Sequence, residues 1–357
     1  MANKRQSILR AGCALMIGLA APTLALAQEE SEEIIVTATK RATNIQDVPF
    51  SVNAQTEEDI QRTGSSSLED VSRNIAGMSI QNLGPGQSQV ALRGVSAGQI
   101  VRDQPGVKEQ VGVYIDESVV SLSLFTPDLD LYDLNRIETL RGPQGTLFGS
   151  GSVGGTIRYI TNQPDVDAFG ASVEGNYNVL QDGGDGGHLK GMINVPIVPG
   201  AVALRITGYG TEYGGFIDAL REGGGVSEDV NSGSREGFRA ALTMNFTPDL
   251  VVTPRLIYQH VQIDGFNRQE AYNLFANPFT TDPPRPPVTF DERQQFLMLD
   301  EEFSDETTIA DVTVNWDLGN TALTSITSYV NRNILASRDA SALTGSVSVD
   351  LGYPDPG

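Results

Sequence analysis

Apolar and polar side chains alternate along the chain in several separate runs after residue 164. Between residues 169 and 179, the apolar residues Phe169, Val173 and Tyr177 have one parity, and the polar residues Glu174 and Asn176 have the other. A period of two residues is typical of a β-strand with one apolar face and one polar face. We therefore predict seven strands, which lie at residues 168–180, 188–198, 201–217, 236–247, 251–264, 306–318 and 321–334.

The connections between these predicted strands alternate in length. Short turns follow the second, fourth and sixth strands, at residues 199–200, 248–249 and 319–320. Longer loops follow the first, third and fifth strands, at residues 181–187, 218–235 and 265–304. Outer-membrane barrels have short periplasmic turns and long extracellular loops, whereas a soluble β-sandwich has no reason to alternate in this way. The pattern therefore favours antiparallel transmembrane β-barrel strands.

The chain between residues 28 and 165 has a mixed α/β pattern. Acidic residues at 57–59 favour the start of a short helix, and residues 67–75 predict a second helix that Gly77 ends. Short runs of apolar and β-branched residues predict strands at 78–81, 89–93, 111–115, 137–141 and 156–160. We therefore predict an α/β domain in front of the barrel strands.

Residues 1–27 have the features of a secretory signal peptide. Three basic residues come first, residues 11–24 are mostly apolar, and residues 25–27 form a small-x-small cleavage site. As a membrane helix this run is too short, because a span needs about 20 apolar residues. We therefore predict an exported protein.

Composition narrows the possible chemistry. The only cysteine is Cys13, inside the predicted signal peptide, so the mature chain would have no thiol for a disulfide or a metal site. Cleavage would remove three of the 24 basic residues and none of the 45 acidic residues, which changes the formal net charge from -21 to 21 − 45, or −24. This acidic balance disfavours nucleic acid as a partner, because phosphate contacts need clustered Lys and Arg.

The sequence offers no catalytic or metal-binding constellation. Residues 149–154 fit the spacing G-x-G-x-x-G, but a β-branched strand follows them where a nucleotide site needs a helix. His188 and His260 are the only histidines, and they lie in separate predicted strands, so a catalytic triad or a zinc site lacks its residues. We therefore predict that the protein is not an enzyme and needs no cofactor.

Two motifs carry a resemblance to a known family. The glycine-rich run from Arg141 to Ile160 closely resembles the end of the plug domain of TonB-dependent outer-membrane receptors, and residues 32–39 resemble the TonB box of that family. The resemblance is to receptors of the iron-complex type. It implies a TonB box and linker at residues 28–45, a plug domain at 46–165 and the N-terminal part of a transmembrane β-barrel at 166–357. A plugged barrel has about 22 strands, so we expect an N-terminal fragment that holds about seven of them.

The resemblance also implies partners for two parts of the plug. TonB would add a strand to the segment formed by Ile34, Ile35, Val36, Thr37 and Ala38, although these residues could instead be the first strand of the plug. Arg141 and Arg158 would dock the plug against carboxylates of the barrel wall, because a buried arginine needs a charged or backbone partner.

Two polar, glycine-rich stretches of the plug, at residues 81–87 and 96–104, are the expected contacts of the transported ligand. Their candidate ligand-binding residues are Gln81, Asn82, Gln87, Ser96, Gln99 and Arg102. Only their position in loops supports this expectation.

The resemblance implies a receptor of the cell outer membrane that takes up a scarce ligand actively, driven by the proton-motive force. Its partners would be TonB with the inner-membrane motor, outer-membrane lipid and the ligand. A ferric siderophore is the family's commonest ligand, with ferric iron present only as part of it, while vitamin B12, heme, sugars and aromatic compounds remain open. The alternatives are a passive porin or adhesin barrel with an N-terminal domain, and a secreted soluble enzyme.

Overall fold

The computed structural model describes residues 33–96, 110–120, 126–221, 224–270 and 288–340 of the 357-residue chain. The predicted signal peptide, Gln99 and Arg102 lie outside these ranges. All the helices and strands discussed below belong to one compact unit, Ile34–Gly357.

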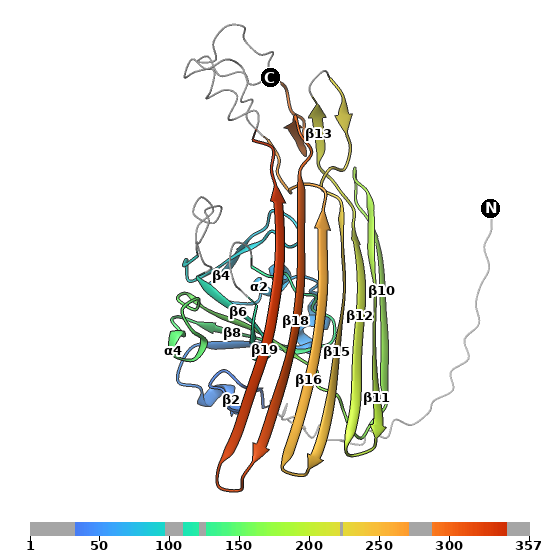
Figure 1. Cartoon of the computed structure of the whole chain (residues 1–357). Helices are drawn as coiled ribbons and strands as arrows, with labels where there is room; N and C mark the ends of the chain where they lie inside the picture. The colour runs from blue at the N-terminus through green and yellow to red at the C-terminus, as the bar shows by residue number, and fades with distance from the viewer. Residues whose placement is uncertain (1–32, 97–109, 121–125, 222–223, 271–287, 341–357) are drawn as a thin grey trace, which may run out of the picture. The chain divides into compact units, whose positions relative to one another are not determined.

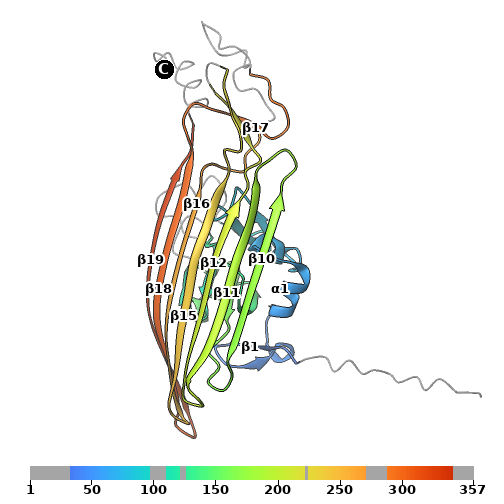
Figure 2. The ribbon, with the colours of Figure 1, turned by 90° about the vertical axis from the view of Figure 1, so that its right-hand side faces the viewer.

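The C-terminal part of this unit is one antiparallel sheet of seven strands, which we call the wall. Its strands pair in chain order, as Figures 1 and 2 show. They are β10 (Gly170–Val179), β11 (Asp185–Val198), β12 (Val202–Tyr213), β15 (Gly233–Thr247), β16 (Leu250–Ile263), β18 (Glu302–Asp317) and β19 (Ala322–Ser337). The seven strands predicted from the side-chain period and their antiparallel order are confirmed.

Local sequence explains the short turns and the two faces of the wall. Gly200 and Gly319 have φ values of 75° and 83°, which glycine adopts at little cost in a tight turn. One face of the wall exposes large apolar residues such as Val173 and Trp316, while the opposite face carries buried polar residues such as Arg235. This arrangement is inverted relative to a soluble protein and suits a sheet with lipid on its outer side. None of the described helices is both long and apolar enough to span a membrane.

The N-terminal part, residues 34–161, is an α/β domain. Its central sheet has the strand order β3 (Val52–Thr56), β8 (Leu134–Arg141), β9 (Gly155–Thr161), β6 (Val111–Ile115) and β7 (Ser118–Val119). Around it lie the hairpin β4 (Met78–Gln81) with β5 (Gln89–Leu92), the pair β1 (Ile35–Val36) with β2 (Thr43–Asn44), the 3-10 turn Ile45–Asp47, and the helices α1 (Glu57–Thr63), α2 (Leu68–Ser72) and α4 (Gly145–Phe148).

Capping side chains fix the two predicted helices. Thr56 and Asp59 form a reciprocal capping box at the start of α1, and Ser67 and Asp70 form a second one at α2. Such caps satisfy backbone N–H groups that have no partner within the helix. Gly64 ends α1 with φ 62°, the left-handed conformation that glycine adopts most easily.

The main hydrophobic core joins the α/β domain to the wall. It includes Ile137 and Ile157 of the central sheet together with Ile257 of β16 and Ile309 of β18. The α/β domain therefore packs against the concave face of the wall (Figure 2). This shared core holds the functional side chains of the two parts in contact.

Some elements were not predicted. The long connections contain a small sheet in which β13 (Asp218–Arg221) pairs with β14 (Val226–Ser227) and, in parallel, with β17 (Gln294–Leu297). The glycine-rich run contains the one-turn helix α4 before it enters β9. Each of these elements has four residues or fewer, which is too short to produce a readable period.

Candidate functional site: a latched N-terminal strand and a charged domain–wall seam

The segment of residues 34–38, which we call the box segment, is docked on the α/β domain. Ile35 and Val36 pair with Asn44 and Thr43 in a two-stranded antiparallel ladder. Val36 and Ala38 are fully buried and belong to the same apolar cluster as Phe148. The backbone N–H of Thr37 donates to Glu138 Oε1 at 2.7 Å. In this conformation the segment is an element of the domain, not an unpaired strand.

A buried ion pair between Glu138 and Arg158 contacts the box segment. Glu138 on β8 and Arg158 on β9 occupy opposing positions of the ladder, and both side chains are 0% exposed. Arg158 Nη1 donates to Glu138 Oε2 at 2.5 Å and to Thr37 Oγ1 at 2.8 Å. Arg136 Nε adds a hydrogen bond of 2.9 Å to Glu138 Oε1. The pair therefore fixes the middle of the box segment by charge-assisted hydrogen bonds.

A second carboxylate completes the cluster, which we call the latch. Glu117 Oε1 accepts from Arg158 Nη2 at 2.7 Å, and Glu117 Oε2 pairs with Lys40 Nζ. Lys40 also lies over the Phe148 ring, 4.3 Å from its centroid, in cation–π geometry. Lys40 is two residues beyond Ala38, so the latch (Lys40, Glu117, Glu138 and Arg158) holds both the middle and the end of the box segment.

A second charged region joins the α/β domain to the wall. Residues 126–133 run along the wall strands and present three acidic side chains to them, which we call the aspartate ladder (Asp128, Asp130 and Asp133). Leu129 and Leu131, which alternate with these carboxylates, are each 4% exposed and pack into the main core. This segment therefore has an apolar side for the domain and a charged side for the wall.

Each aspartate of the ladder has a basic partner on a different wall strand. Asp128 pairs with Arg235 on β15, Asp130 accepts from Lys190 Nζ on β11 at 2.8 Å, and Asp133 accepts from Arg205 Nε on β12 at 3.1 Å. Gln259 on β16 bonds the backbone between them, donating to Asp128 O at 2.9 Å and accepting from Asp130 N at 3.2 Å. The side chain of Gln259 thus makes the backbone hydrogen bonds that a neighbouring strand would otherwise make with residues 128–130.

Basic residues of the wall lower the pKa values of two ladder carboxyls. Burial alone would raise the pKa of Asp130, but the charges of Lys190 and Arg235 outweigh burial and hold that pKa below its ordinary value. Burial opposes ionisation of Asp133 too, and hydrogen bonds from Arg205 and Thr207 likewise lower its pKa. Both groups are therefore charged at neutral pH and contribute to docking in that form.

Acid should weaken this seam. A carboxyl whose folded pKa is depressed contributes its full stability above the unfolded pKa, about 4, and loses that stability as the pH falls through the folded pKa. We expect the melting temperature of the full chain, measured by calorimetry, to fall as the pH drops below about 4. The double variant Asp130→Asn/Asp133→Asn should melt lower at neutral pH and lose much of this acid dependence. An unchanged acid dependence in the double variant would contradict this role for the ladder.

The structure corrects the predicted docking role of Arg141 and Arg158. Arg141 Nη1 donates to Ala76 O at 2.9 Å, and Arg158 binds Glu138 and Glu117, so the described contacts of both side chains lie inside the α/β domain. Arg158 cannot reach the wall because it sits in the interior of the central sheet, opposite Glu138. We predicted arginines of the domain against carboxylates of the wall. The ion pairs between the two parts have the opposite arrangement, with arginines on the wall and carboxylates on the domain.

The predicted ligand-binding residues occupy different environments. Gln81 ends β4, and Ser96 lies just before a range that the structure does not describe. Asn82 lines a cleft of ≈ 420 Å³ between the domain and the wall, together with Lys190. Gln87 is fully buried and donates to Gly265 O, two residues beyond β16, at 3.3 Å, so it is closed off from the solvent. Of these residues, Asn82 is the one placed at the cleft.

The described residues contain no group of three or more His, Cys, Asp or Glu side chains that could hold a metal ion. In the glycine-rich run, Gly149 ends α4, and Gly155 begins β9. A strand therefore follows the G-x-G-x-x-G spacing, as predicted, and no helix N-terminus is presented to a phosphate there.

Comparison with known proteins gives a consistent result. Residues 44–156 match the family described as TonB-dependent Receptor Plug Domain. The chain is 32% identical over 194 residues to the pesticin receptors of Yersinia pestis and Yersinia enterocolitica, a match that covers 52% of this chain and 27% of each receptor. The chain thus spans about a quarter of the length of these curated relatives.

Solved structures share the fold. The ferric yersiniabactin uptake receptor FyuA from Yersinia pestis superposes with a TM-score of 0.64 and 19% identity, over 82% of this chain and 42% of that one. The ferripyoverdine receptor of the outer membrane of Pseudomonas aeruginosa gives a TM-score of 0.64 and 16% identity, over 85% of this chain and 37% of that one.

Proposed function

We propose that the chain carries the plug domain of the TonB-dependent receptors, followed by strands of their barrel, and that it acts in energy-driven uptake across the outer membrane. The α/β domain is the plug, and the wall is part of the barrel that surrounds it. We propose that the transported ligand is a ferric siderophore. No covalent chemistry is needed, so the protein acts as a transporter and not as an enzyme.

The docked box segment is the observation that carries this proposal. A passive porin has no use for an N-terminal strand that is held by a dedicated cluster of buried charges. A transporter driven from the periplasm does, because its driving partner needs a segment to capture. Capture by strand addition uses main-chain hydrogen bonds, so the box segment must leave the latch before TonB can pair with it.

The ligand class rests on the relatives. FyuA is a ferric yersiniabactin uptake receptor, and a second structural relative was solved bound to ferripyoverdine. We propose that Asn82 at the cleft contacts a ligand of this class. Gln81, at the end of β4, and Ser96, Gln99 and Arg102 remain proposed contacts on the basis of the sequence pattern alone.

Uptake should depend on TonB and on the box backbone. Val36→Pro removes one main-chain N–H, whereas Val36→Ala keeps it and loses only side-chain volume. In cells that carry the full-length protein we expect uptake of ⁵⁵Fe-yersiniabactin or ⁵⁵Fe-pyoverdine to fall to background in Val36→Pro and in a strain without TonB. Val36→Ala should retain most of the uptake at equal surface levels. Uptake that continues without TonB would contradict the proposed function.

Uptake of other compounds would show whether the ligand is not a ferric siderophore. If neither iron complex is taken up, the same cells are tested with cyanocobalamin and heme. TonB-dependent uptake of either compound would keep the transport mechanism and overturn the siderophore assignment.

A further inference from the structure

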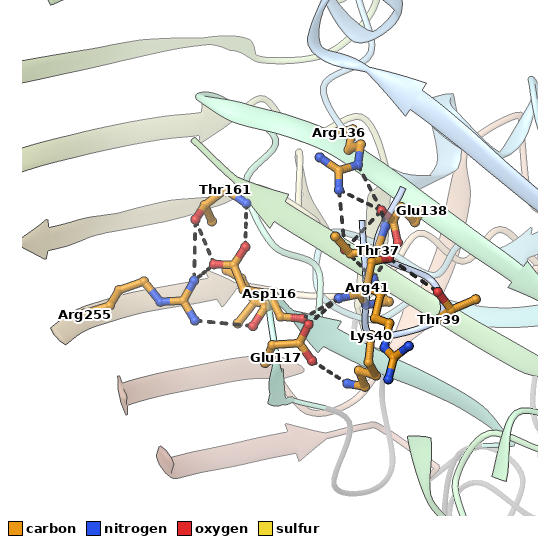
Figure 3. A network of polar contacts seen from close by, with 12 residues as sticks. Thr37, Thr39, Lys40, Arg41, Asp116, Glu117, Arg136, Glu138, Thr161 and Arg255 are labelled. Atoms are coloured by element: carbon orange, nitrogen blue, oxygen red, sulfur yellow. Dashed lines mark hydrogen bonds and ion pairs between the residues drawn. The ribbon is translucent and has the colours of Figure 1, made fainter. Parts of the chain in front are cut away.

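The turn between β6 and β7 lies between the latch and the wall. It consists of Asp116 and Glu117, and the flanking residues Ile115 and Ser118 pair across it. Although Asp116 and Glu117 are neighbours in the sequence, their carboxylates bind in different directions (Figure 3). Asp116 binds Arg255 of the wall, and Glu117 belongs to the latch, where it binds Lys40 and Arg158.

On the wall side, Arg255 of β16 holds one flank of the turn. Its guanidinium pairs with Asp116, and its Nη2 donates to Ile115 O at 3.3 Å. The other flank is held by Asp311 of β18, which accepts from Ser118 Oγ at 3.0 Å. Arg255 Nη2 also donates to Asp311 at 2.5 Å, so the two wall residues form one unit. Both sides of the turn are therefore fixed to the wall.

On the latch side, Glu117 bridges Lys40 and Arg158. Arg158 in turn donates to Thr37 in the middle of the box segment, and the N–H of Lys40 donates to Thr37 O at 2.9 Å. Displacement of Glu117 would therefore remove one partner from each of the two cations that hold the box segment.

The turn is short and rigid, so its two carboxylates cannot move independently. Asp116 has φ 48°, accepts hydrogen bonds from Thr161 N and Oγ1 at 2.8 Å each, and donates its own N–H to Tyr159 O at 2.7 Å. A two-residue hairpin turn leaves no slack between its central residues. A shift of Asp116 relative to the wall is therefore transmitted to Glu117.

We propose that Arg255 is a positioning residue for the box segment: through the Asp116–Glu117 turn, the wall holds Glu117 against Lys40 and Arg158 and so keeps the latch closed. A change at β16 and β18 that weakens the contact of Arg255 with Asp116 opens the latch from a distance. This inference rests on the proposed function, in that the box segment is the segment that TonB captures.

The test measures how often the box segment leaves the domain. Cys13 is the only cysteine of residues 1–357, so Ala38→Cys in a Cys13→Ser background is the single thiol of these residues, and the same background without Ala38→Cys gives the labelling to be subtracted. Ala38 is fully buried, and a maleimide reaches a thiol there only when the segment opens. The labelling rate is measured on the full-length protein in outer-membrane vesicles, without ligand and without TonB.

Arg255→Met and Asp116→Asn should each speed labelling about tenfold, the effect expected for the loss of one charge-assisted hydrogen bond. Glu117→Gln acts on the latch directly and should give at least that increase. Asp116→Asn is the variant most certain to fold, because Arg255 keeps Asp311 and because asparagine tolerates a positive φ. If Arg255→Met fails to assemble, the labelling rate of Asp116→Asn shows whether loss of the Arg255–Asp116 contact opens the latch.

Arg235→Met is the matched control. It breaks a more deeply buried contact between wall and domain, the one with Asp128 and Asp130, but Arg235 makes no described contact with the latch. Labelling in this variant should change less than about twofold if the coupling is specific to the turn. Equal acceleration in Arg235→Met and Arg255→Met, or no acceleration in Asp116→Asn, would overturn the proposal.

The two proposals fail in distinguishable ways. If uptake proves independent of the box segment, the proposed function fails, yet Asp116→Asn still accelerates labelling. If Asp116→Asn leaves labelling unchanged, the coupling fails, and TonB-dependent uptake is unaffected.

Discussion

Glu138→Ala should destabilise the α/β domain by about 3–5 kcal/mol, because it leaves a fully buried arginine without its main counter-charge. Arg158 is 0% exposed and keeps only Glu117 as a charged partner. The substitution also removes the acceptor for Thr37 N–H, so the box segment should open with it. Hydrogen exchange of the full chain, followed by mass spectrometry, measures both effects in β8 and in residues 34–38.

Two controls separate the buried pair from charge in general. Arg73→Ala breaks an exposed pair with Glu69 and Asp70, since the Arg73 side chain is 70% exposed, and should cost less than about 1 kcal/mol. The double variant Glu138→Leu/Arg158→Met replaces the pair by apolar residues and should recover much of the lost stability. Its box segment should still exchange fast, because the acceptor for Thr37 is absent. Slow exchange of residues 34–38 in Glu138→Ala would refute the latch.

The wall could be predicted from the sequence because its signal is local. Each strand has at least ten residues of period two, and the short turns contain glycine or proline where the chain reverses. The strand predicted at residues 251–264 has the least regular alternation, because Arg255, Gln259 and His260 interrupt it. On the inner face of β16, Ile257 lies between the polar residues Arg255 and Gln259 and joins the core of the α/β domain, whereas Val261 packs with Phe303 in a smaller cluster of wall residues. That face therefore mixes an apolar residue of the shared core with polar residues that bind the domain.

The latch could not be predicted because it depends on which strands are neighbours. Glu138 and Arg158 each interrupt an apolar strand, which is a visible sign of a buried charge. Their pairing follows only from the order β8–β9 in the sheet, which the sequence does not state. Arg158 was therefore assigned to the wall, although its partner lies 20 residues before it in the chain.

The aspartate ladder has a local signal in the sequence. Asp128, Leu129, Asp130 and Leu131 alternate with a period of two, as a strand with one buried face would. The segment has no strand partner of its own, and Gln259 bonds its backbone instead. The wall strands carry Lys190, Arg205 and Arg235 at alternate, polar positions. The charges of the wall and of residues 128–133 are therefore complementary in the sequence. Their pairing required the three-dimensional structure.

Gly155→Ala should be among the most damaging single substitutions in the glycine-rich run. Gly155 starts β9 with φ 155°, and a Cβ there would lie 2.3 Å from Leu140 O and 2.5 Å from Leu92 Cδ1. The first contact is with backbone of the neighbouring strand, which cannot move without breaking the β8–β9 ladder beside the latch. We expect a loss of about 3 kcal/mol or more from overlap and backbone strain together.

Gly145→Ala is the matched substitution in the same run. Gly145 lies in α4, and a Cβ built on it meets no atom within 4 Å. Alanine is favoured over glycine in a helix by up to about 1 kcal/mol, so this variant should be neutral or slightly stabilised. Denaturant unfolding of the full chain and hydrogen exchange of β9 compare the two. If both alanines were tolerated equally, close packing at Gly155 would not be what ties this run to the ladder, and the glycines would serve chain flexibility instead.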